Sequence, residues 1–157
     1  MSTVKEAVDV EVPIREAYNQ WTQFEEFPKF MEGVEEVRQL DDRHNHWTTS
    51  IGGVRREFDT EIVDQLPDDR ITWRSVGGDT QQRGSVQFER LDDTRTRVEL
   101  TMEVEPTGVV EKGADALGVI GRRVKGDMRR YKDYVESGGD SGGWRGRIRP
   151  GNPGETL

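Results

Sequence analysis

The residue of this sequence that is best suited to chemistry is Arg56. If residues 54–66 form a regular strand, Arg56 lies on the same face as Phe58. A guanidinium group on the inner face of a fold could bind a carboxylate or polarise a carbonyl. The glycine pair 52–53 lies close by, however, and a side chain beside a turn can also reach solvent. The pattern therefore predicts either an inward-facing cation or an ordinary surface arginine.

Two histidines are the next candidates. His44 and His46 are two residues apart, which places them on one face if a strand begins there. Such a pair could begin a metal site, but the sequence places no third ligand near it. Because the pair lies beside a turn, we interpret both as surface residues and predict no metal site. The chain has no cysteine, which excludes a thiolate nucleophile and a cysteine-based zinc site.

Paired aspartates occur in the segments LDDR (40–43), LPDDR (66–70) and LDDT (91–94). Two neighbouring carboxylates can carry out acid–base catalysis, but aspartate is also a turn residue because its side chain bonds to nearby backbone. The repetition of the pattern favours hairpin turns. No glycine-rich phosphate loop follows a strand, so no cofactor is predicted.

Cutting the chain at these turns gives an ordered set of elements. Residues 3–12 alternate as a half-buried strand, Pro13 suits the first turn of a helix over about 14–23, and Pro28 predicts a restart in a second short helix. Six strands then follow in a meander, near 34–40, 46–51, 54–66, 70–76, 81–91 and 95–106. The last strand is the clearest, because apolar residues such as Leu100 alternate with acidic ones such as Glu99.

Five aromatic residues follow one another at an unbroken spacing of three: Tyr18, Trp21, Phe24, Phe27 and Phe30. An α-helix turns about 100° per residue, so this spacing would spread them most of the way around one straight helix. Two short helices that meet at an angle would instead let the five side chains converge.

A long amphipathic helix is predicted after residue 106. Its apolar residues are separated by 3, 4, 4, 3 and 4 positions: Leu117, Ile120, Val124, Met128, Tyr131 and Val135. Gly118 and Gly121 flank Ile120, so they either let the helix move to admit a ligand or are simply tolerated. The segment 138–157 is rich in Gly and Arg without periodicity, and we predict a flexible tail after a domain over 1–137.

The composition limits partners and location. The net charge of −8 argues against nucleic-acid binding, which needs a basic surface. No stretch approaches 18 apolar residues, so no stable membrane insertion is predicted. The N-terminal residues lack the apolar core of a signal peptide, and a cytoplasmic location is expected. The oligomeric state is left open.

The elements also predict a hollow. Seven strands spaced about 4.8 Å apart make a sheet roughly 30 Å wide, whereas one helix is only about 10–12 Å across. The sheet must therefore curl around the helix while the short helices close one end. The space between them is either filled by large side chains or available to a ligand.

Several segments resemble a known family: Val12–Pro13, Ala17–Tyr18, Trp21, Phe24, Phe27–Pro28, Phe30–Met31, PDDRITWRS at 67–75 and the C-terminal helix. Residues 1–137 resemble the START-like, birch-pollen-allergen-like superfamily, and within it the polyketide cyclase/dehydrase and lipid-transport group. The resemblance implies an α+β helix-grip fold: a curved antiparallel sheet of seven strands around a long C-terminal helix, with two short helices after the first strand. It also implies an internal apolar pocket for a lipid, quinone or polyketide. Relatives that cyclise polyketides place Arg and Tyr in the cavity; no such set can be matched residue by residue here, and Arg56 and Tyr18 are the residues of these types that we note.

Three functions are consistent with this reading: a carrier of a small hydrophobic ligand, a cyclase/dehydratase-type enzyme, and an interaction or stress-response protein with a filled interior. Whether a reaction is catalysed is left open. The predicted ligand-contacting residues are Trp21, Phe24, Phe27, Phe30, Trp47, Phe58, Trp73, Phe88, Met102, Leu117 and Ile120. Residues of this kind are more often plain core than ligand contacts, but as a group they are the best pocket candidates.

Overall fold

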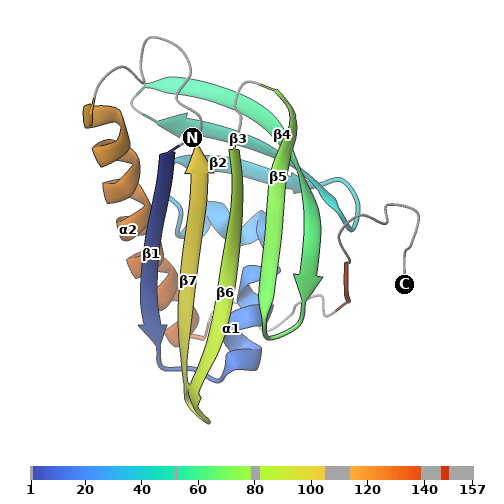
Figure 1. Ribbon diagram of the computed structural model, residues 1–157, viewed down its shortest axis with the longest axis vertical. Helices are drawn as coiled ribbons and strands as arrows, with labels where there is room; N and C mark the ends of the chain where they lie inside the picture. The colour runs from blue at the N-terminus through green and yellow to red at the C-terminus, as the bar shows by residue number, and fades with distance from the viewer. Residues whose placement is uncertain (1, 52, 79–81, 105–113, 139–145, 149–157) are drawn as a thin grey trace.

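The computed structural model describes residues 2–51, 53–78, 82–104, 114–138 and 146–148, with the side chains of 2, 51, 104 and 114–119 left aside (Figure 1). Its elements follow in the predicted order: β1 (Ser2–Val10), α1 (Ile14–Trp21), the 3-10 helix η1 (Phe24–Lys29), β2 (Val34–Gln39), β3 (His44–Ile51), β4 (Val54–Leu66), β5 (Arg70–Gly78), β6 (Gln82–Asp92), β7 (Arg95–Val104) and α2 (Ala114–Glu136).

The seven strands form one antiparallel sheet in the order β1-β7-β6-β5-β4-β3-β2, which confirms the meander and adds β1 beside β7. The sheet is strongly curved (Figure 1). On β7, Val98 and Leu100 face inward and are buried, while Arg97, just before Val98, is exposed and Glu99 between the two is half-buried, as the alternation predicts. The aspartate segments are turns: Asp41 accepts hydrogen bonds from the backbone N–H groups of Arg43 and His44, both at 2.8 Å.

The short helices differ from the prediction in type and position. The chain turns after Trp21, and the second helix is a 3-10 helix that contains Pro28 rather than starting at it. A 3-10 helix has three residues per turn, so side chains three apart lie directly above one another. This geometry places Phe24 and Phe27 on one face of η1, with Phe30 immediately after its end. The spacing of three from Phe24 to Phe30 therefore matches the 3-10 period, which differs from the 100° per residue of an α-helix.

The long helix α2 lies along the β1 side of the sheet, behind it in Figure 1. Its buried residues are those of the predicted stripe, Val124, Met128, Tyr131 and Val135. Near its C-terminal end, Lys132 donates a hydrogen bond to the backbone carbonyl of Asp9 at 2.9 Å.

Part of the predicted tail packs on the domain. Ile148 forms an antiparallel bridge with Gln65 of β4, with backbone hydrogen bonds of 2.8 and 3.0 Å, and its side chain is only 3% exposed. The pairing of β3 with β4 ends at His44, the first residue of β3, which lies opposite Glu61. Gln65 is four residues further along β4, so Ile148 pairs with a part of β4 that β3 does not reach. Most of 138–157 lies outside the described residues, and its flexibility stays a prediction.

None of the described helices is both long enough and apolar enough to pass through a bilayer.

Candidate functional site

The inner face of the curved sheet has two unlike ends. At one end, which we call the closed end, α1, η1 and the C-terminal half of α2 cover the sheet with aromatic side chains. At the other end, the inward-facing side chains of Trp73, Met102 and Ile120 are only half-buried. Trp47 is also half-buried and adjoins both regions, because its ring centroid lies 5.6 Å from that of Phe27. We call this second region, together with Arg56, the accessible half.

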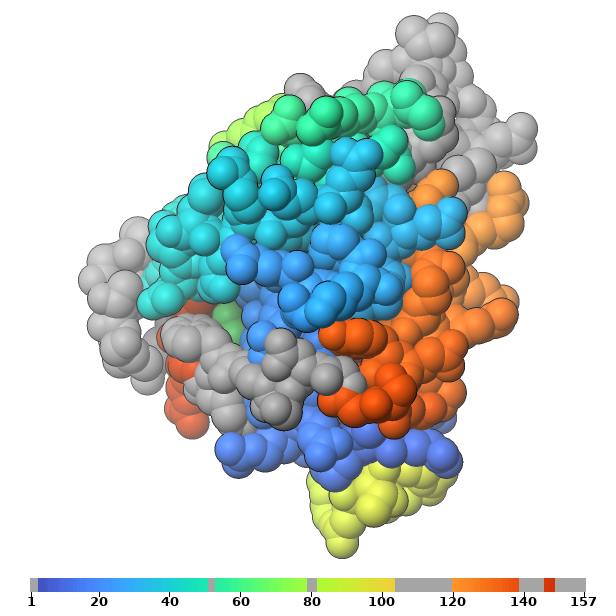
Figure 2. Space-filling model, turned by 180° about the vertical axis from the view of Figure 1, so that it is seen from behind, coloured from blue at the N-terminus to red at the C-terminus, as the bar shows by residue number. Residues whose placement is uncertain are grey.

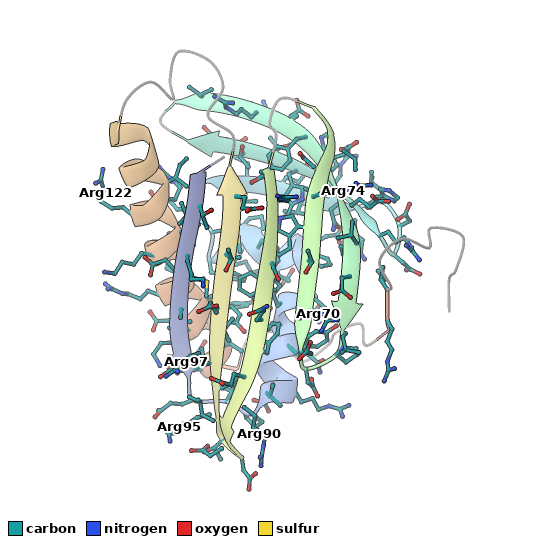
Figure 3. All side chains as sticks on the ribbon, in the orientation of Figure 1. Arg70, Arg74, Arg90, Arg95, Arg97 and Arg122 are labelled. Atoms are coloured by element: carbon teal, nitrogen blue, oxygen red, sulfur yellow. The ribbon has the colours of Figure 1, made fainter. Side chains whose placement is uncertain are left out.

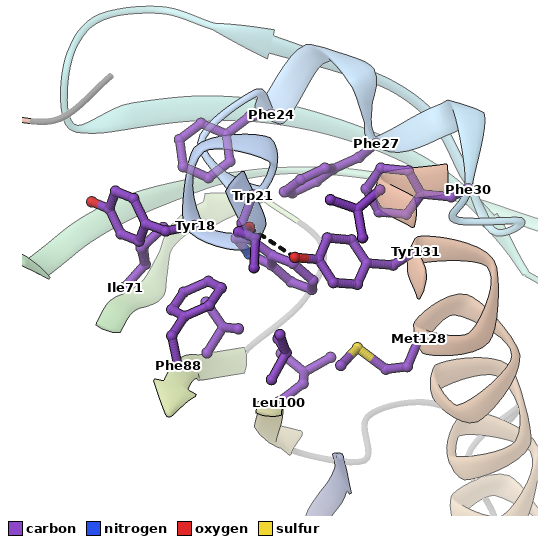
Figure 4. Packing of buried hydrophobic residues seen from close by; sticks show 14 of the residues in the cluster. Tyr18, Trp21, Phe24, Phe27, Phe30, Ile71, Phe88, Leu100, Met128 and Tyr131 are labelled. Carbon is purple, nitrogen blue, oxygen red and sulfur yellow. Dashed lines mark hydrogen bonds between the residues drawn. The ribbon is translucent and has the colours of Figure 1, made fainter. Parts of the chain in front are cut away.

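The closed end is a cluster of aromatic rings in edge-to-face contact (Figure 4). The ring of Trp21 lies 4.9 Å from that of Tyr131 and 5.6 Å from that of Phe27, measured between centroids. Phe27 in turn lies 5.5 Å from Phe24 and 5.6 Å from Phe30. Such pairs add about 0.5–1.5 kcal/mol each beyond the burial of their area. The predicted convergence of the aromatics is confirmed, and they fill this end.

A buried hydroxyl group fixes α2 to α1 at the closed end. The Tyr131 hydroxyl donates a hydrogen bond of 2.7 Å to the backbone carbonyl of Ala17, drawn as a dashed line in Figure 4. Complete burial raises the pKa of this phenol far above its usual value, because the anion would have no water around it. Tyr131 is therefore a neutral donor, suited to structure rather than to proton transfer.

The candidate Tyr18 also belongs to the closed end. Its side chain is fully buried, its ring meets the ring of Phe88 edge-on at 5.4 Å, and its hydroxyl accepts a hydrogen bond of 3.0 Å from the Gln65 amide. The structure therefore does not bring Tyr18 together with Arg56 on the accessible half. Gln65 lies 47 residues from Tyr18, and no local pattern in the sequence links the two.

The remaining predicted contact residues divide between the two ends. Trp21, Phe24, Phe27, Phe30 and Phe88 are buried in or beside the aromatic cluster. Phe58 is also buried, while Trp47, Trp73, Met102 and Ile120 are half-buried. The side chain of Leu117 lies outside the described residues.

Two indole rings shape the accessible half. Trp73 of β5 pairs with Gly84 of β6, and a Cβ atom at Gly84 would lie 2.5 Å from the Trp73 ring. The glycine thus allows the ring to lie flat against the sheet. Trp47 stacks on Phe58 with an interplanar angle of 7° and donates its indole hydrogen to the Thr60 hydroxyl at 2.8 Å. Broad apolar ring surface therefore faces the interior.

Arg56 is half-buried and lies on the inner face of β4, opposite Thr49 of β3. Its neighbour Arg55 points outward and forms an ion pair with Glu35 at 3.7 Å. The sequence analysis did not single out Glu6, which shares the inner face of β1 with Val4 and is half-buried. The alternation of residues 4, 6 and 8 along the predicted strand is the sequence pattern that places Glu6 on the inner face.

The α2 helix is also held to the loop after η1. Arg130 donates a hydrogen bond of 2.9 Å to the backbone carbonyl of Phe30, and Asp127 accepts one of 3.1 Å from the Glu32 N–H. Burial raises the pKa of the Asp127 carboxyl, an effect that its hydrogen bond from Arg130 partly offsets. In Figure 2 the blue and cyan surfaces of η1 and β2 accordingly adjoin the orange surface of α2.

The two histidines lie on the outer face of the sheet. His46 is placed between Asp59, 2.6 Å from its Nδ1, and Glu57, 3.1 Å from its Nε2. These hydrogen bonds, that with Asp59 first, raise the pKa of His46. In the part of the chain that the structure describes, no group of three or more His, Asp or Glu could hold a metal ion.

A curled antiparallel sheet of seven strands that grips a C-terminal helix defines the helix-grip class of START-like proteins. Residues 10–131 match the family model described as polyketide cyclase / dehydrase and lipid transport, and the chain belongs to this family.

An uncharacterised 17.2 kDa protein of Streptomyces lincolnensis is 51% identical over 149 residues, which are 94% of this chain and 99% of the relative. Among solved structures, a START superfamily protein of Mycobacterium smegmatis superposes with a TM-score of 0.77 at 16% identity, covering 86% of this chain and 97% of the other. The Zhui aromatase/cyclase of a Streptomyces species superposes with a TM-score of 0.72 at 16% identity, covering 88% and 99%. These two structures show the shared fold.

Proposed function

We propose that the protein binds and carries a small hydrophobic molecule, such as a lipid, quinone or polyketide-like compound, in the accessible half. One observation carries this proposal: Trp47, Trp73, Met102 and Ile120 face the inside of the grip, yet they are only half-buried. Covering apolar surface contributes about 25 cal/mol per Å², so a ligand that lies on these side chains gains affinity. The family's description, which includes lipid transport, supports the same reading.

Native mass spectrometry of freshly purified protein tests the proposal. We expect a co-purifying small molecule, or a rise in melting temperature with a member of a panel of lipids, quinones and polyphenols. Trp73→Ala should weaken this binding. Arg74→Ala is the matched control, because Arg74 is the next residue on β5 but is exposed and pairs with Glu61 at 2.9 Å. No bound molecule and no change in melting with any compound would contradict the proposal.

A second function, catalysis of the cyclase/dehydratase type, is favoured by one residue. Arg56 lies on the inner face of β4 and is half-buried, where a guanidinium group could orient a carboxylate or polarise a carbonyl. Tyr18 does not support it, because its hydroxyl is buried at the closed end. Arg56→Leu should abolish turnover of a polyketide-like substrate, whereas the outward-facing Arg55→Leu should not. Equal effects of the two variants would remove this alternative.

The third class, a protein with a filled interior, describes the closed end only. The half-buried inward side chains of the accessible half argue against it for the molecule as a whole.

A further inference from the structure

We propose that the outer face of α2 docks on anionic phospholipid membranes through a basic stripe formed by Arg122, Lys125 and Arg129. The three residues are separated by three and four positions, so they lie on one side of the helix. All three side chains are exposed. Among the described residues, none of the three has an ion pair or hydrogen-bond partner for its side chain.

This stripe differs from the rest of the charged surface. The protein has 31 acidic and 23 basic residues, and on the strands the labelled arginines of Figure 3 all have acidic partners. Arg74 pairs with Glu61, Arg97 pairs with Asp9, and the same holds for Arg70, Arg90 and Arg95. Arg122 instead projects from α2 away from the sheet (Figure 3). Three neighbouring cations that have no acidic partner among the residues the structure describes form a local surface complementary to an anionic partner.

The position of the stripe favours a membrane as that partner. Ile120 belongs to the accessible half and precedes Arg122 by only two residues. Two residues turn an α-helix by about 200°, so Ile120 faces the interior from the side of α2 opposite Arg122. A surface bound to the stripe therefore lies about one helix diameter, roughly 10–12 Å, from the proposed ligand site. Because a hydrophobic ligand is concentrated in the bilayer, docking there would shorten its path. An acidic protein would match the charge but would not account for this proximity. The inference rests on the proposed function in this respect.

The expected binding is weak and reversible. Each Lys or Arg close to an anionic leaflet contributes about a fivefold increase in the binding constant, so three give about a hundredfold. The net charge of −8 opposes approach to an anionic surface, and the stripe offsets this repulsion only when α2 faces the membrane. Salt should weaken the interaction, because the Debye length is only about 8 Å at physiological ionic strength. In Figure 2, α2 forms one side of the molecule, where a flat surface can reach it.

Co-sedimentation of the full chain with vesicles tests the proposal, comparing phosphatidylcholine vesicles with and without phosphatidylserine. We expect binding only with phosphatidylserine, weakened by added salt. Arg122→Gln combined with Lys125→Gln should weaken it about 25-fold. The matched control combines Arg15→Gln with Arg147→Gln, two exposed arginines outside α2 that change the net charge equally. The control should bind as the wild type does, and all variants should melt alike.

Three results would overturn the inference: no binding to phosphatidylserine vesicles, equal weakening by the stripe and control variants, or binding to soluble polyglutamate without binding to vesicles. Failure of the proposed function is recognised separately, since it shows as absence of a ligand in native mass spectrometry. Stripe variants should keep that ligand.

Discussion

The two ends of the inner face are built from the same sheet and the same alternation of residues, yet one is closed and the other is accessible. At the closed end, Trp21 is 1% exposed beneath η1 and α2. At the accessible half, Trp73 also faces inward, from β5, but it is half-buried. The difference arises because α1 and η1 cover only one end of the sheet. Stability is therefore expected to depend on the first end and ligand binding on the second.

The largest expected effect separates these two roles. Trp21→Ala should lower the free energy of unfolding by about 3–5 kcal/mol, because it leaves a cavity among packed rings. Trp73→Ala should cost clearly less, since solvent already reaches part of its ring. Urea denaturation of both variants measures the difference. Equal losses would show that the two ends contribute alike to the core.

A smaller loss of stability tests the hydrogen bond between Tyr131 and Ala17 at the closed end. Tyr131→Phe removes the donor to the buried Ala17 carbonyl and should cost about 1–3 kcal/mol of unfolding free energy. Tyr134→Phe is the control: Tyr134 is partly buried, and its hydroxyl lies 3.4 Å from Glu26. If Tyr134→Phe lowers the unfolding free energy as much as Tyr131→Phe does, the hydrogen bond from Tyr131 to Ala17 does not stabilise the closed end.

The glycines of α2 test whether the accessible half needs a mobile helix. A Cβ atom at Gly121 would meet nothing within 4 Å, so Gly121→Ala should raise stability by about 1 kcal/mol through helix propensity. At Gly126 the Cβ would lie 3.2 Å from the Arg130 guanidinium, so Gly126→Ala should gain less. Thermal melting measures both. Ligand uptake that is unchanged in the more stable Gly121→Ala would reject a gating role for this glycine.

The smallest expected effect is a pH dependence of stability that arises from His46 on the outer face of the sheet. Because Asp59 and Glu57 raise the pKa of His46 above 6.5, the protonated form is favoured in the folded state. This contribution to stability is fully present below about pH 6.5 and is lost as the pH rises through the folded-state pKa. The stability of the wild type relative to His46→Gln should fall over that range, and Asp59→Asn should reduce the fall. The affinity for ligand should not change with pH over this range. A change in affinity that parallels the change in stability would contradict the separation of the outer and inner faces of the sheet.

The sequence predicted the sheet and the long helix because their patterns are local and regular. Alternation along 95–104 and the 3, 4, 4, 3, 4 spacing of α2 each fix one buried face, and burial at Leu100 and Met128 confirms them. The prediction for the short helices was wrong in detail, since Pro28 lies within η1. The 3-10 period accounts for the spacing of Phe24, Phe27 and Phe30, whereas Tyr18 and Trp21 lie on the α-helix before it.

The candidate site was less predictable than the fold. Alternation can assign Trp47 and Trp73 to the inner face, but their exposure depends on where distant helices end. Tyr18 shows the same limit, because its partner Gln65 is brought to it only by tertiary packing. The bridge at Ile148 involves a single residue pair in a segment without periodicity, so no pattern could predict it.

The most direct test of two unlike ends uses the indole N–H signals of Trp21, Trp47 and Trp73 in a nitrogen–proton correlation spectrum of the labelled protein. A hydrophobic ligand identified by the melting panel is titrated into the full chain. The account predicts that the signals of Trp47 and Trp73 shift with the ligand while that of Trp21 stays in place. A dominant shift of Trp21, or no shift of Trp47 and Trp73 at saturation, would contradict it.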